Sequence, residues 1–466
     1  MPLRLATAAL LLAATGCAAL RGAPPQLPPL GDAAEVHVYL QRLPREAERL
    51  SFAVERLSLV RSDGTEVPLA VEPLVADGAD GAPQRLLAWG RVAPGDYTAV
   101  IVKAASAALG RGSERAALLG APEPARADLA IRLAPGRAAV VWLELAASSV
   151  EELSFVPRFR AAVAPRTAPR AALYCTGERA ASVTVADRAA RVVTGVVPVP
   201  ATPRGIAIDV VASRAYVALH LEDRIEVLDL AAGVPVGEIR MSPGDGPGDL
   251  AIAADGTLVV VNVRSRSVAF VAPGALSELS RVPVGDDPVA LLLDRQGRRA
   301  FVTNRASASV TVIDVPNRAV LGTISTDPEP LRTALSWDGN LLYVVHRGSH
   351  YVASFAVPSL VPQARTFVGL GATSVRVDAR TGLVYLSRGA ERRIAVLDPL
   401  ALQQVDTIDA PGEVTIMTID DAENTLLALV PELRIVLVVD LTSRRRLAEI
   451  PVGDGPYALA FWGERP

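Results

Sequence analysis

The sequence predicts an all-β protein, and three observations support this prediction. Of 466 residues, 50% are hydrophobic but only 4% are aromatic, so the apolar content is mostly Ala, Val and Leu. That composition suits thin β-layers with many small buried positions. Short apolar or alternating runs recur along the chain between turn-forming Gly, Pro, Asp and Asn. The C-terminal two-thirds also repeats with a period of about 42 residues.

Charge and motifs exclude several functional classes. With 47 basic and 50 acidic residues the net charge is −3, which does not predict a nucleic-acid partner. Two cysteines and four histidines exclude a disulfide framework, a Cys-rich zinc module and an iron–sulfur protein. The motifs CxxCH, GxxxxGK[ST], HExxH and GxSxG do not occur. We therefore expect no cofactor and no metal site.

Residues 1–17, MPLRLATAALLLAATGC, are typical of an export signal. Arg4 provides a positive start, and residues 5–15 form an apolar run that is too short to span a bilayer. The small residues before Cys17 resemble the bacterial lipoprotein signal, which implies cleavage before Cys17 and lipidation of its thiol. The alternative is an ordinary secretory signal cut near residues 18–19. Residues 1–16 are the expected signal peptide.

The residues that follow predict the location of the mature chain. By the sorting rule of lipoproteins, Ala18 implies the outer membrane, so we expect a lipid-anchored protein of the cell envelope on its periplasmic or surface face. Residues 17–32 include four prolines and predict a semi-rigid tether. No later segment reaches about 18 uninterrupted apolar residues, so no membrane span is expected.

Residues 33–163 predict an antiparallel β-sandwich of about eight strands. The expected strands are 35–40, 52–60, 66–73, 85–90, 95–105, 127–134, 137–145 and 153–159. The PGDYT turn at 94–98 resembles a corner found in several secreted β-sandwich families, and the order of segments is similar to an uncharacterised lipoprotein-associated domain. That resemblance implies no activity. Residues 164–170, APRTAPR, are the expected linker.

Three landmarks keep one period through the rest of the chain. The first is the run FVTN at 301–304, whose equivalents end at Gly177, Leu219, Asn262, Asn304, His346, Arg388 and Val430. The second is an aspartate that ends the following strand, at Asp187, Asp229, Asp314, Asp398 and Asp440. The third is a proline that opens the unit, at Pro203, Pro247, Pro288, Pro330 and Pro456. Each unit contains four short strands, which is the pattern of a β-propeller blade.

The number of units predicts how the ring closes. Six complete units run from 203 to 455, after an incomplete unit of three strands at 172–199. The remaining strand, YALAF at 457–461, can supply the missing first strand, so residues 171–466 predict a seven-bladed β-propeller closed by the C-terminal strand. An open β-solenoid is the alternative, but it gives this strand no role.

The best repeat unit indicates a family. FVTN, the following VTVIDV and PVGDDP at 283–288 resemble the YVTN-type β-propeller repeats of bacterial and archaeal cell-surface and periplasmic proteins. The resemblance covers 171–466, although the third unit lacks the aspartate and the seventh has LALV in place of FVTN. It implies the fold strongly and the function weakly, because propellers serve many unrelated functions.

Propeller geometry predicts a ligand site at one rim and the channel mouth. Four arginines fall at near-equivalent positions of successive units, and such an array suits carboxylate, sulfate or phosphate groups. The alternatives are mutual neutralisation by acidic rim residues or cation binding by those acids. His346 and His350 are expected to be a loop pair rather than metal ligands. The predicted ligand-binding residues are Arg264, Arg305, Arg332, Arg347, Arg388, His346 and His350, and no catalytic residue is predicted.

These patterns favour a non-catalytic binding or scaffold protein tethered to a membrane through its lipid anchor. Its expected partner is a protein, a polysaccharide or another anionic component of the envelope. The alternative is a periplasmic enzyme, similar to propeller lactonases, lyases or oxidoreductases, with its site at the channel mouth. Cys175, in a strand pattern with no histidine near it in sequence, is expected to be a small core residue.

Overall fold

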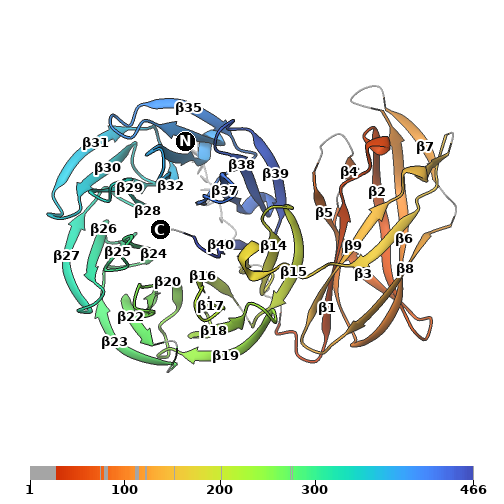
Figure 1. Ribbon diagram of the computed structural model, residues 1–466, viewed down its shortest axis with the longest axis horizontal. Helices are drawn as coiled ribbons and strands as arrows, with labels where there is room; N and C mark the ends of the chain where they lie inside the picture. Colours follow the sequence, from red (N-terminus) through yellow and green to blue (C-terminus); the bar gives the residue numbers. More distant parts are fainter. Residues whose placement is uncertain are drawn as a thin grey trace, which may run out of the picture.

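The computed structural model describes residues 28–464 except 74, 78–81, 111–114, 121–122, 152, 201, 273 and 275. The chain is all-β, with strands joined by short loops and single turns of 3-10 helix. An N-terminal β-domain lies beside a ring of seven four-stranded sheets (Figure 1). The predicted signal peptide and Cys17 lie outside the described residues. Within these residues no helix has the length and apolar character needed to cross a membrane.

The N-terminal β-domain is one curled sheet whose two halves cover a common hydrophobic core. Its strands follow the order β10-β11-β7-β6-β2-β3-β5-β1-β9-β12, with β4 against β2 and β8 against β6. The pairing is mostly antiparallel, but β1 is parallel to β9 and β7 is parallel to β11. The strands are β1 (Ala34–Gln41), β2 (Leu50–Arg61), β3 (Glu66–Val71), β4 (Val75–Asp77), β5 (Gln84–Val92), β6 (Gly95–Leu109), β7 (Ala116–Gly120), β8 (Ala125–Leu133), β9 (Ala138–Leu145), β10 (Val150–Glu151), β11 (Ser154–Phe155) and β12 (Phe159–Val163).

One predicted strand of this domain differs from the structure. The segment 153–159 was expected to be continuous, but β11 pairs with β7 and β12 pairs with β9. Pro157 lies between them and has no N–H to donate to a ladder, so the chain can leave one edge of the sheet and join the other there. The short strands β4, β7 and β10 were not predicted, because none is long enough to show alternation.

The ring contains seven sheets of four antiparallel strands, and each sheet is one blade. Blade 1 consists of β13 (Ala172–Gly177), β14 (Ser182–Asp187), β15 (Val192–Pro198) and β40 (Pro456–Phe461). Blades 2 to 4 follow as β16 (Pro203–Asp209), β17 (Arg214–Leu219), β18 (Arg224–Asp229), β19 (Val234–Arg240), β20 (Pro247–Ile252), β21 (Leu258–Asn262), β22 (Ser267–Ala272), β23 (Ser277–Pro283), β24 (Pro288–Leu293), β25 (Arg299–Asn304), β26 (Ser309–Asp314) and β27 (Ala319–Ser325). Blades 5 to 7 are β28 (Pro330–Leu335), β29 (Leu341–His346), β30 (Tyr351–Ala356), β31 (Pro362–Phe367), β32 (Ala372–Val377), β33 (Val384–Arg388), β34 (Arg393–Leu397), β35 (Gln404–Asp409), β36 (Ile416–Asp420), β37 (Thr425–Val430), β38 (Ile435–Asp440) and β39 (Arg446–Pro451).

The C-terminal strand closes the ring as predicted. Strand β40 pairs antiparallel with β13, so the first and last strands of the propeller belong to one blade. The hydroxyl of buried Thr176 donates to the Arg204 carbonyl at 2.6 Å and accepts the Ala458 amide at 3.0 Å. Strand β40 therefore takes its place among the first strands of the other blades, which lie toward the centre of the ring in Figure 1.

The recurring polar residues of the repeat stabilise the blades themselves. Each recurring aspartate accepts a hydrogen bond from the backbone amide three residues later, in the turn before the outer strand; for Asp314 and Asn317 the distance is 2.8 Å. The side chain of Asn304 is fully buried and donates to Ser309 and Thr311. These recurring residues provide hydrogen bonds to turns and strand ends. Their recurrence therefore indicates the fold and carries no information about the function.

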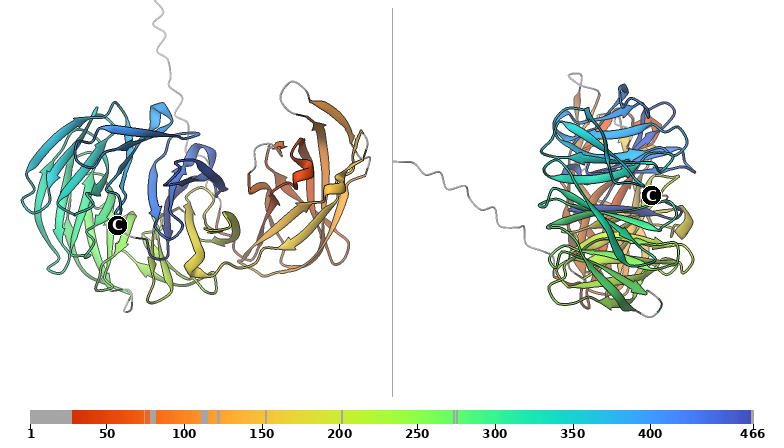
Figure 2. Two further views of the ribbon diagram at one scale, coloured as in Figure 1. Left: turned by 45° about the horizontal axis from the view of Figure 1, so that its top comes forward. Right: turned by 90° about the vertical axis from the view of Figure 1, so that its left-hand side faces the viewer.

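The N-terminal β-domain packs against the edge of the ring at β15 and β39 and lies over neither of its faces (Figures 1 and 2). The side-chain amide of Gln84 donates to the Val193 carbonyl and accepts the Val193 amide. The indole of Trp142 donates to the same carbonyl at 3.0 Å. A hydrophobic cluster shared by both parts, including Tyr39 and Val196, lies around these bonds and joins the two parts.

Candidate functional site at the rim and channel mouth

The loops that follow the second strand of each blade meet the loops between blades at one rim of the ring. The Arg305 amide donates to the Asp287 carbonyl at 2.9 Å, and the Arg347 amide donates to the Glu329 carbonyl at 3.0 Å. The Arg264 amide makes the corresponding bond to Asp245 at 3.0 Å. The predicted arginines 264, 305 and 347 therefore start from equivalent backbone positions on one rim.

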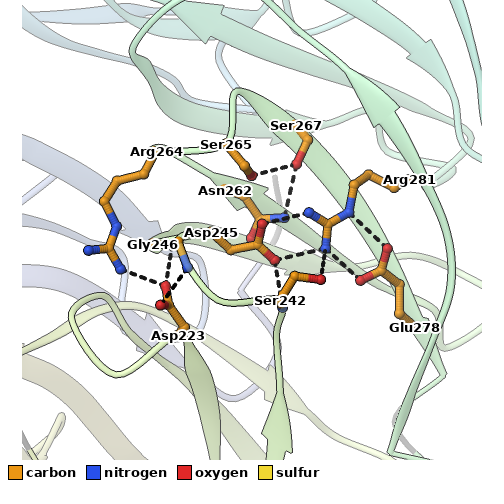
Figure 3. Close-up of polar contacts among 11 residues, drawn as sticks. Asp223, Ser242, Asp245, Gly246, Asn262, Arg264, Ser265, Ser267, Glu278 and Arg281 are labelled. Carbon is orange, nitrogen blue, oxygen red and sulfur yellow. Dashed lines mark hydrogen bonds and ion pairs between the residues drawn. The ribbon is translucent and has the colours of Figure 1, made fainter.

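Arg264 is bound within this rim (Figure 3). Its guanidinium donates to an Asp223 carboxylate oxygen at 2.6 Å and to the His220 carbonyl at 3.2 Å. The same carboxylate accepts the amides of Gly244 and Gly246, which holds the pKa of Asp223 below its ordinary value despite partial burial. Arg264 thus serves to fix the loop between blades 2 and 3.

The other three arginines of the predicted array also lie next to carboxylates. The guanidinium of Arg305 binds Asp287 at 2.6 Å, and that of Arg347 approaches Glu413 more loosely, at 3.5 Å. Arg388 contacts the Glu391 carboxylate at 3.2 Å and also bonds the Gln404 side chain. Each cation is paired with its own acid, so the four do not converge on a common vacant anion site.

The two predicted histidines occupy different environments. His346 is fully buried, and neither ring nitrogen has a hydrogen-bond partner of normal geometry among the described residues. Burial lowers its pKa, against the field of Asp327. His350 is exposed, and its ring stacks on Phe367 with centroids 6.0 Å apart. No group of three or more metal-ligating side chains occurs in the described part of the chain.

Arg332, the remaining predicted residue, lies on the inner strand β28 at the channel. Its guanidinium is 3.7 Å from the Asp249 carboxylate of β20, beyond hydrogen-bond distance, and its side chain is 26% exposed. Arg204 on β16 lies over the ring of Tyr457, with its guanidinium carbon 5.4 Å from the ring centre. Arg204 also binds Glu178 at 3.0 Å. These five residues form the channel-mouth cluster.

Burial controls the ionisation of this cluster. It raises the pKa of Asp249, although Arg332 and two amides that bond the carboxylate oppose the effect. Burial also raises the pKa of Tyr457, against the fields of Arg332 and Arg204. The Tyr457 hydroxyl therefore stays protonated at neutral pH. A ligand that entered the channel would meet a neutral phenol between two cations.

A second charged pair lies in the interior of the ring. Burial raises the pKa of Glu464 and is opposed by the charge of Arg376 on β32 and by the Thr418 hydroxyl, which donates to this carboxylate at 2.6 Å. Glu464 follows the closing strand β40. Its carboxylate therefore links the end of the chain to blades 6 and 7.

Most of the channel-mouth cluster was missed by the sequence prediction. Arg204 and Tyr457 immediately follow the recurring opening proline of their units, so their position in the repeat could have placed them at the channel. Asp249 is one of the acidic rim residues, which were expected only to neutralise the arginines or to bind a cation. Cys175 is buried as predicted, and burial raises the pKa of its thiol, so it is not an activated nucleophile.

Comparisons with known proteins show the fold and no family. No family model and no curated protein matches the chain. Among solved structures, the chain is similar to Kuenenia stuttgartiensis hydrazine synthase, with a TM-score of 0.53 and 17% identity over 60% of this chain and 95% of that chain. It is also similar to dihydro-heme d1 dehydrogenase NirN, with a TM-score of 0.50 and 14% identity over 64% of this chain and 77% of that one. At such identities the similarity shows the β-propeller fold alone.

Proposed function

We propose that the protein is a lipid-anchored component of the cell envelope that binds an anionic group of an envelope partner without transforming it. The binding surface is the propeller rim together with the channel-mouth cluster. The partner is a protein or a polysaccharide that carries carboxylate, sulfate or phosphate groups. Arg347, with a side chain 56% exposed and a loose contact to Glu413, lies on this surface and can exchange its acid for an anion of the partner.

The observation that carries this proposal is the state of Arg332. Its nearest carboxylate, Asp249, is 3.7 Å away, and no hydrogen bond from its guanidinium is present within the described residues. Asp249 already neutralises part of the charge of the half-buried Arg332, but the N–H donors of the Arg332 guanidinium are still available. A ligand anion can therefore gain charge-assisted hydrogen bonds without displacing an existing one.

The envelope location rests on the N-terminal residues. Export followed by lipidation at Cys17 would place both β-domains outside the cytoplasm, in the outer membrane, on a proline-containing tether. Mass spectrometry of the N-terminal peptide tests this directly. We expect a lipid-modified peptide that begins at Cys17. We also expect the wild type in the membrane fraction and the C17S variant in the soluble fraction. An unmodified N-terminus at residue 18 or 19 would contradict the anchor.

Binding is tested with the mature chain and two arginine variants. Isothermal titration with sulfate, phosphate and acetate, and affinity capture from solubilised envelopes, compare wild type with R332Q and R332Q/R204Q. Loss of the charged donors is expected to weaken binding about tenfold or more, because charge-assisted hydrogen bonds contribute about 1.5–3 kcal/mol. R126Q is the matched control, since Arg126 is an exposed arginine of β8 far from the ring.

Two outcomes would overturn the proposal. If R332Q and R126Q bind the anions equally, the channel-mouth cluster is not the site. If the purified protein turns over an ester, lactone or polysaccharide substrate in a manner that Arg332 or Tyr457 variants abolish, the propeller is an enzyme of the alternative class. High salt should weaken true binding, since the attraction is between charges.

A further inference from the structure

A cavity of about 300 Å³ lies between the N-terminal β-domain and blade 1, away from the channel. One wall is the outer face of β1 and β5, and the other is formed by β14 and by rim loops of blades 1 and 7. Its volume is at the lower end of the range for small-molecule sites, which often occur at domain interfaces. The bonds of Gln84 and Trp142 to Val193 hold the two walls in place.

The wall on the N-terminal β-domain is built by strand alternation. Along β1, Val36 and Val38 enter the domain core, while Glu35, His37 and Tyr39 face the cavity. Nε2 of His37 lies 2.6 Å from a Glu35 carboxylate oxygen, and both side chains are buried. The ring of Trp89, opposite on β5, is parallel to that of His37 within 17°.

Tyr39 provides the second, independent indication of a ligand. Its side chain is only 2% exposed, yet its hydroxyl makes no hydrogen bond to any residue in the described part of the chain. The residue lines the cavity. The hydroxyl keeps contact with the space of the cavity. Water or a ligand there can supply the hydrogen bond that the described residues do not.

The charges around the cavity are balanced in pairs. Arg179 binds both oxygens of Asp454, at 2.7 and 3.0 Å. Arg434 binds Glu72 at 2.7 Å across the domain boundary. The third carboxylate, that of Glu35, is held by His37 and Arg91, whose hydrogen bonds and charges keep the pKa of Glu35 low despite burial.

This balance decides the chemical class of the ligand. A charged ligand would have to displace a partner from one of these ion pairs, which costs the desolvation of the displaced group. A neutral ligand with many hydroxyls can donate to the carboxylates and accept from the guanidiniums without breaking any pair. The half-buried indole of Trp89 adds an apolar surface for the C–H groups of a ring.

We propose that the interdomain cavity is a binding site for a neutral sugar unit, with the Tyr39 hydroxyl as a hydrogen-bonding anchor and Trp89 as the stacking surface. This site shares no residue with the channel-mouth cluster and does not depend on the function proposed for it. Arg179 and Asp454 belong to the rim loops, so the cavity borders the proposed binding face.

Titration calorimetry and tryptophan fluorescence of the mature full-length protein test the site. The probes are glucose and N-acetylglucosamine, with glucuronate and glucosamine as charged analogues. We expect saturable binding of a neutral sugar, weaker binding of both charged analogues, and a fivefold to tenfold loss of affinity in Y39F, as for about one lost hydrogen bond. The control Y351F alters a partly exposed tyrosine of blade 5 and should bind as wild type.

Stability distinguishes a ligand anchor from a structural hydroxyl. Because the Tyr39 hydroxyl has no protein partner, Y39F should unfold in guanidinium at the same or a higher concentration than wild type. W89L, which removes the indole ring but keeps an apolar side chain at a half-buried position, should also lose sugar binding. The proposal is overturned if neither sugar binds at millimolar concentration, if a charged analogue binds best, if Y39F binds as wild type, or if Y39F is clearly destabilised.

Discussion

The side chain of Gln84 pairs with the backbone of Val193 as a second strand would, accepting its amide at 2.7 Å and donating to its carbonyl at 3.2 Å. Gln84 begins β5 of the N-terminal β-domain, and Val193 lies on the outer strand of blade 1. The glutamine is 2% exposed, so both bonds are shielded from water. One side chain thereby provides hydrogen-bond partners for backbone groups at the edge of blade 1 and holds the neighbouring domain against that edge.

Substitution of this glutamine should weaken the joint between the domains. Q84L fills a similar volume but leaves the Val193 amide and carbonyl without these partners, which should cost about 1–3 kcal/mol of unfolding free energy. Guanidinium denaturation measures the loss, and limited proteolysis within 164–170 should become faster. Q363L, at an exposed glutamine of β31, is the control. Equal stability of the two variants would argue against the Gln84 bonds as the joint.

Closure of the ring depends on the hydroxyl of Thr176. T176V keeps the shape of the side chain but leaves the Ala458 amide and the Arg204 carbonyl without this buried partner. The expected cost is about 1–3 kcal/mol, visible as a lower denaturation midpoint. Hydrogen exchange should show the loss in β40 before the other blades. T98V, at an exposed threonine of β6, should change neither measurement.

The recurring aspartate of the repeat should contribute to stability at each turn. D314A removes the acceptor of the Asn317 amide and should lower the unfolding free energy by about 1 kcal/mol. Ligand binding at the channel mouth should be unaffected, because Asp314 acts in the turn before the outer strand. A variant with normal stability but impaired anion binding would assign the repeat motif a functional role instead.

His346 should make the protein sensitive to mild acid. Burial lowers its pKa below the ordinary value of 6.5, against the field of Asp327, so the unfolded chain takes up this proton more readily than the folded chain. The stability contribution is therefore complete above pH 6.5 and decreases as the pH falls below it. Denaturation midpoints of wild type and H346N between neutral pH and about pH 5 measure the effect. The exposed His350 gives the control H350N, which should retain the wild-type pH dependence.

The thiol of Cys175 should be unreactive in the folded protein. Its side chain is buried, and burial raises the pKa of the thiol, so little thiolate forms and reagents have no access. A thiol reagent should label the protein only after denaturant is added. Rapid labelling of the native chain would show that blade 1 opens readily. That result would contradict the expectation that β40 keeps the blade closed.

The repeat allowed much of the fold to be predicted, because each landmark has a local physical cause. The Asp314 carboxylate accepts a hydrogen bond from the amide three residues later, and Pro288 begins a strand. Both residue types therefore recur with the period of the repeat. The splitting of 153–159 was not predicted, since the choice of partner strands at Pro157 depends on edges contributed by β7 and β9. Sequence spacing carries no information about such distant edges.

The functional sites were predictable only in part. Arg264, Arg305, Arg347 and Arg388 were identified from their near-equivalent positions in the repeat. Their pairing with separate acids depends on loop conformations that the period of the repeat does not describe. Arg332 and Arg204 are neighbours of Tyr457 only because the ring closes. The interdomain cavity brings together Tyr39 and Asp454, which are separated by almost the whole chain.

The sequence by itself determined the all-β class, the number of blades and the closing strand, because strand alternation and turn chemistry act over a few residues and repeat. The tertiary structure alone decided which charges are neutralised and that the N-terminal β-domain lies against the edge of blades 1 and 7. It also decided that the Tyr39 hydroxyl faces the cavity there with no hydrogen-bond partner among the described residues. Those features are set by distances between segments far apart in the chain. Electrostatic and hydrogen-bond energies fall steeply with such distances.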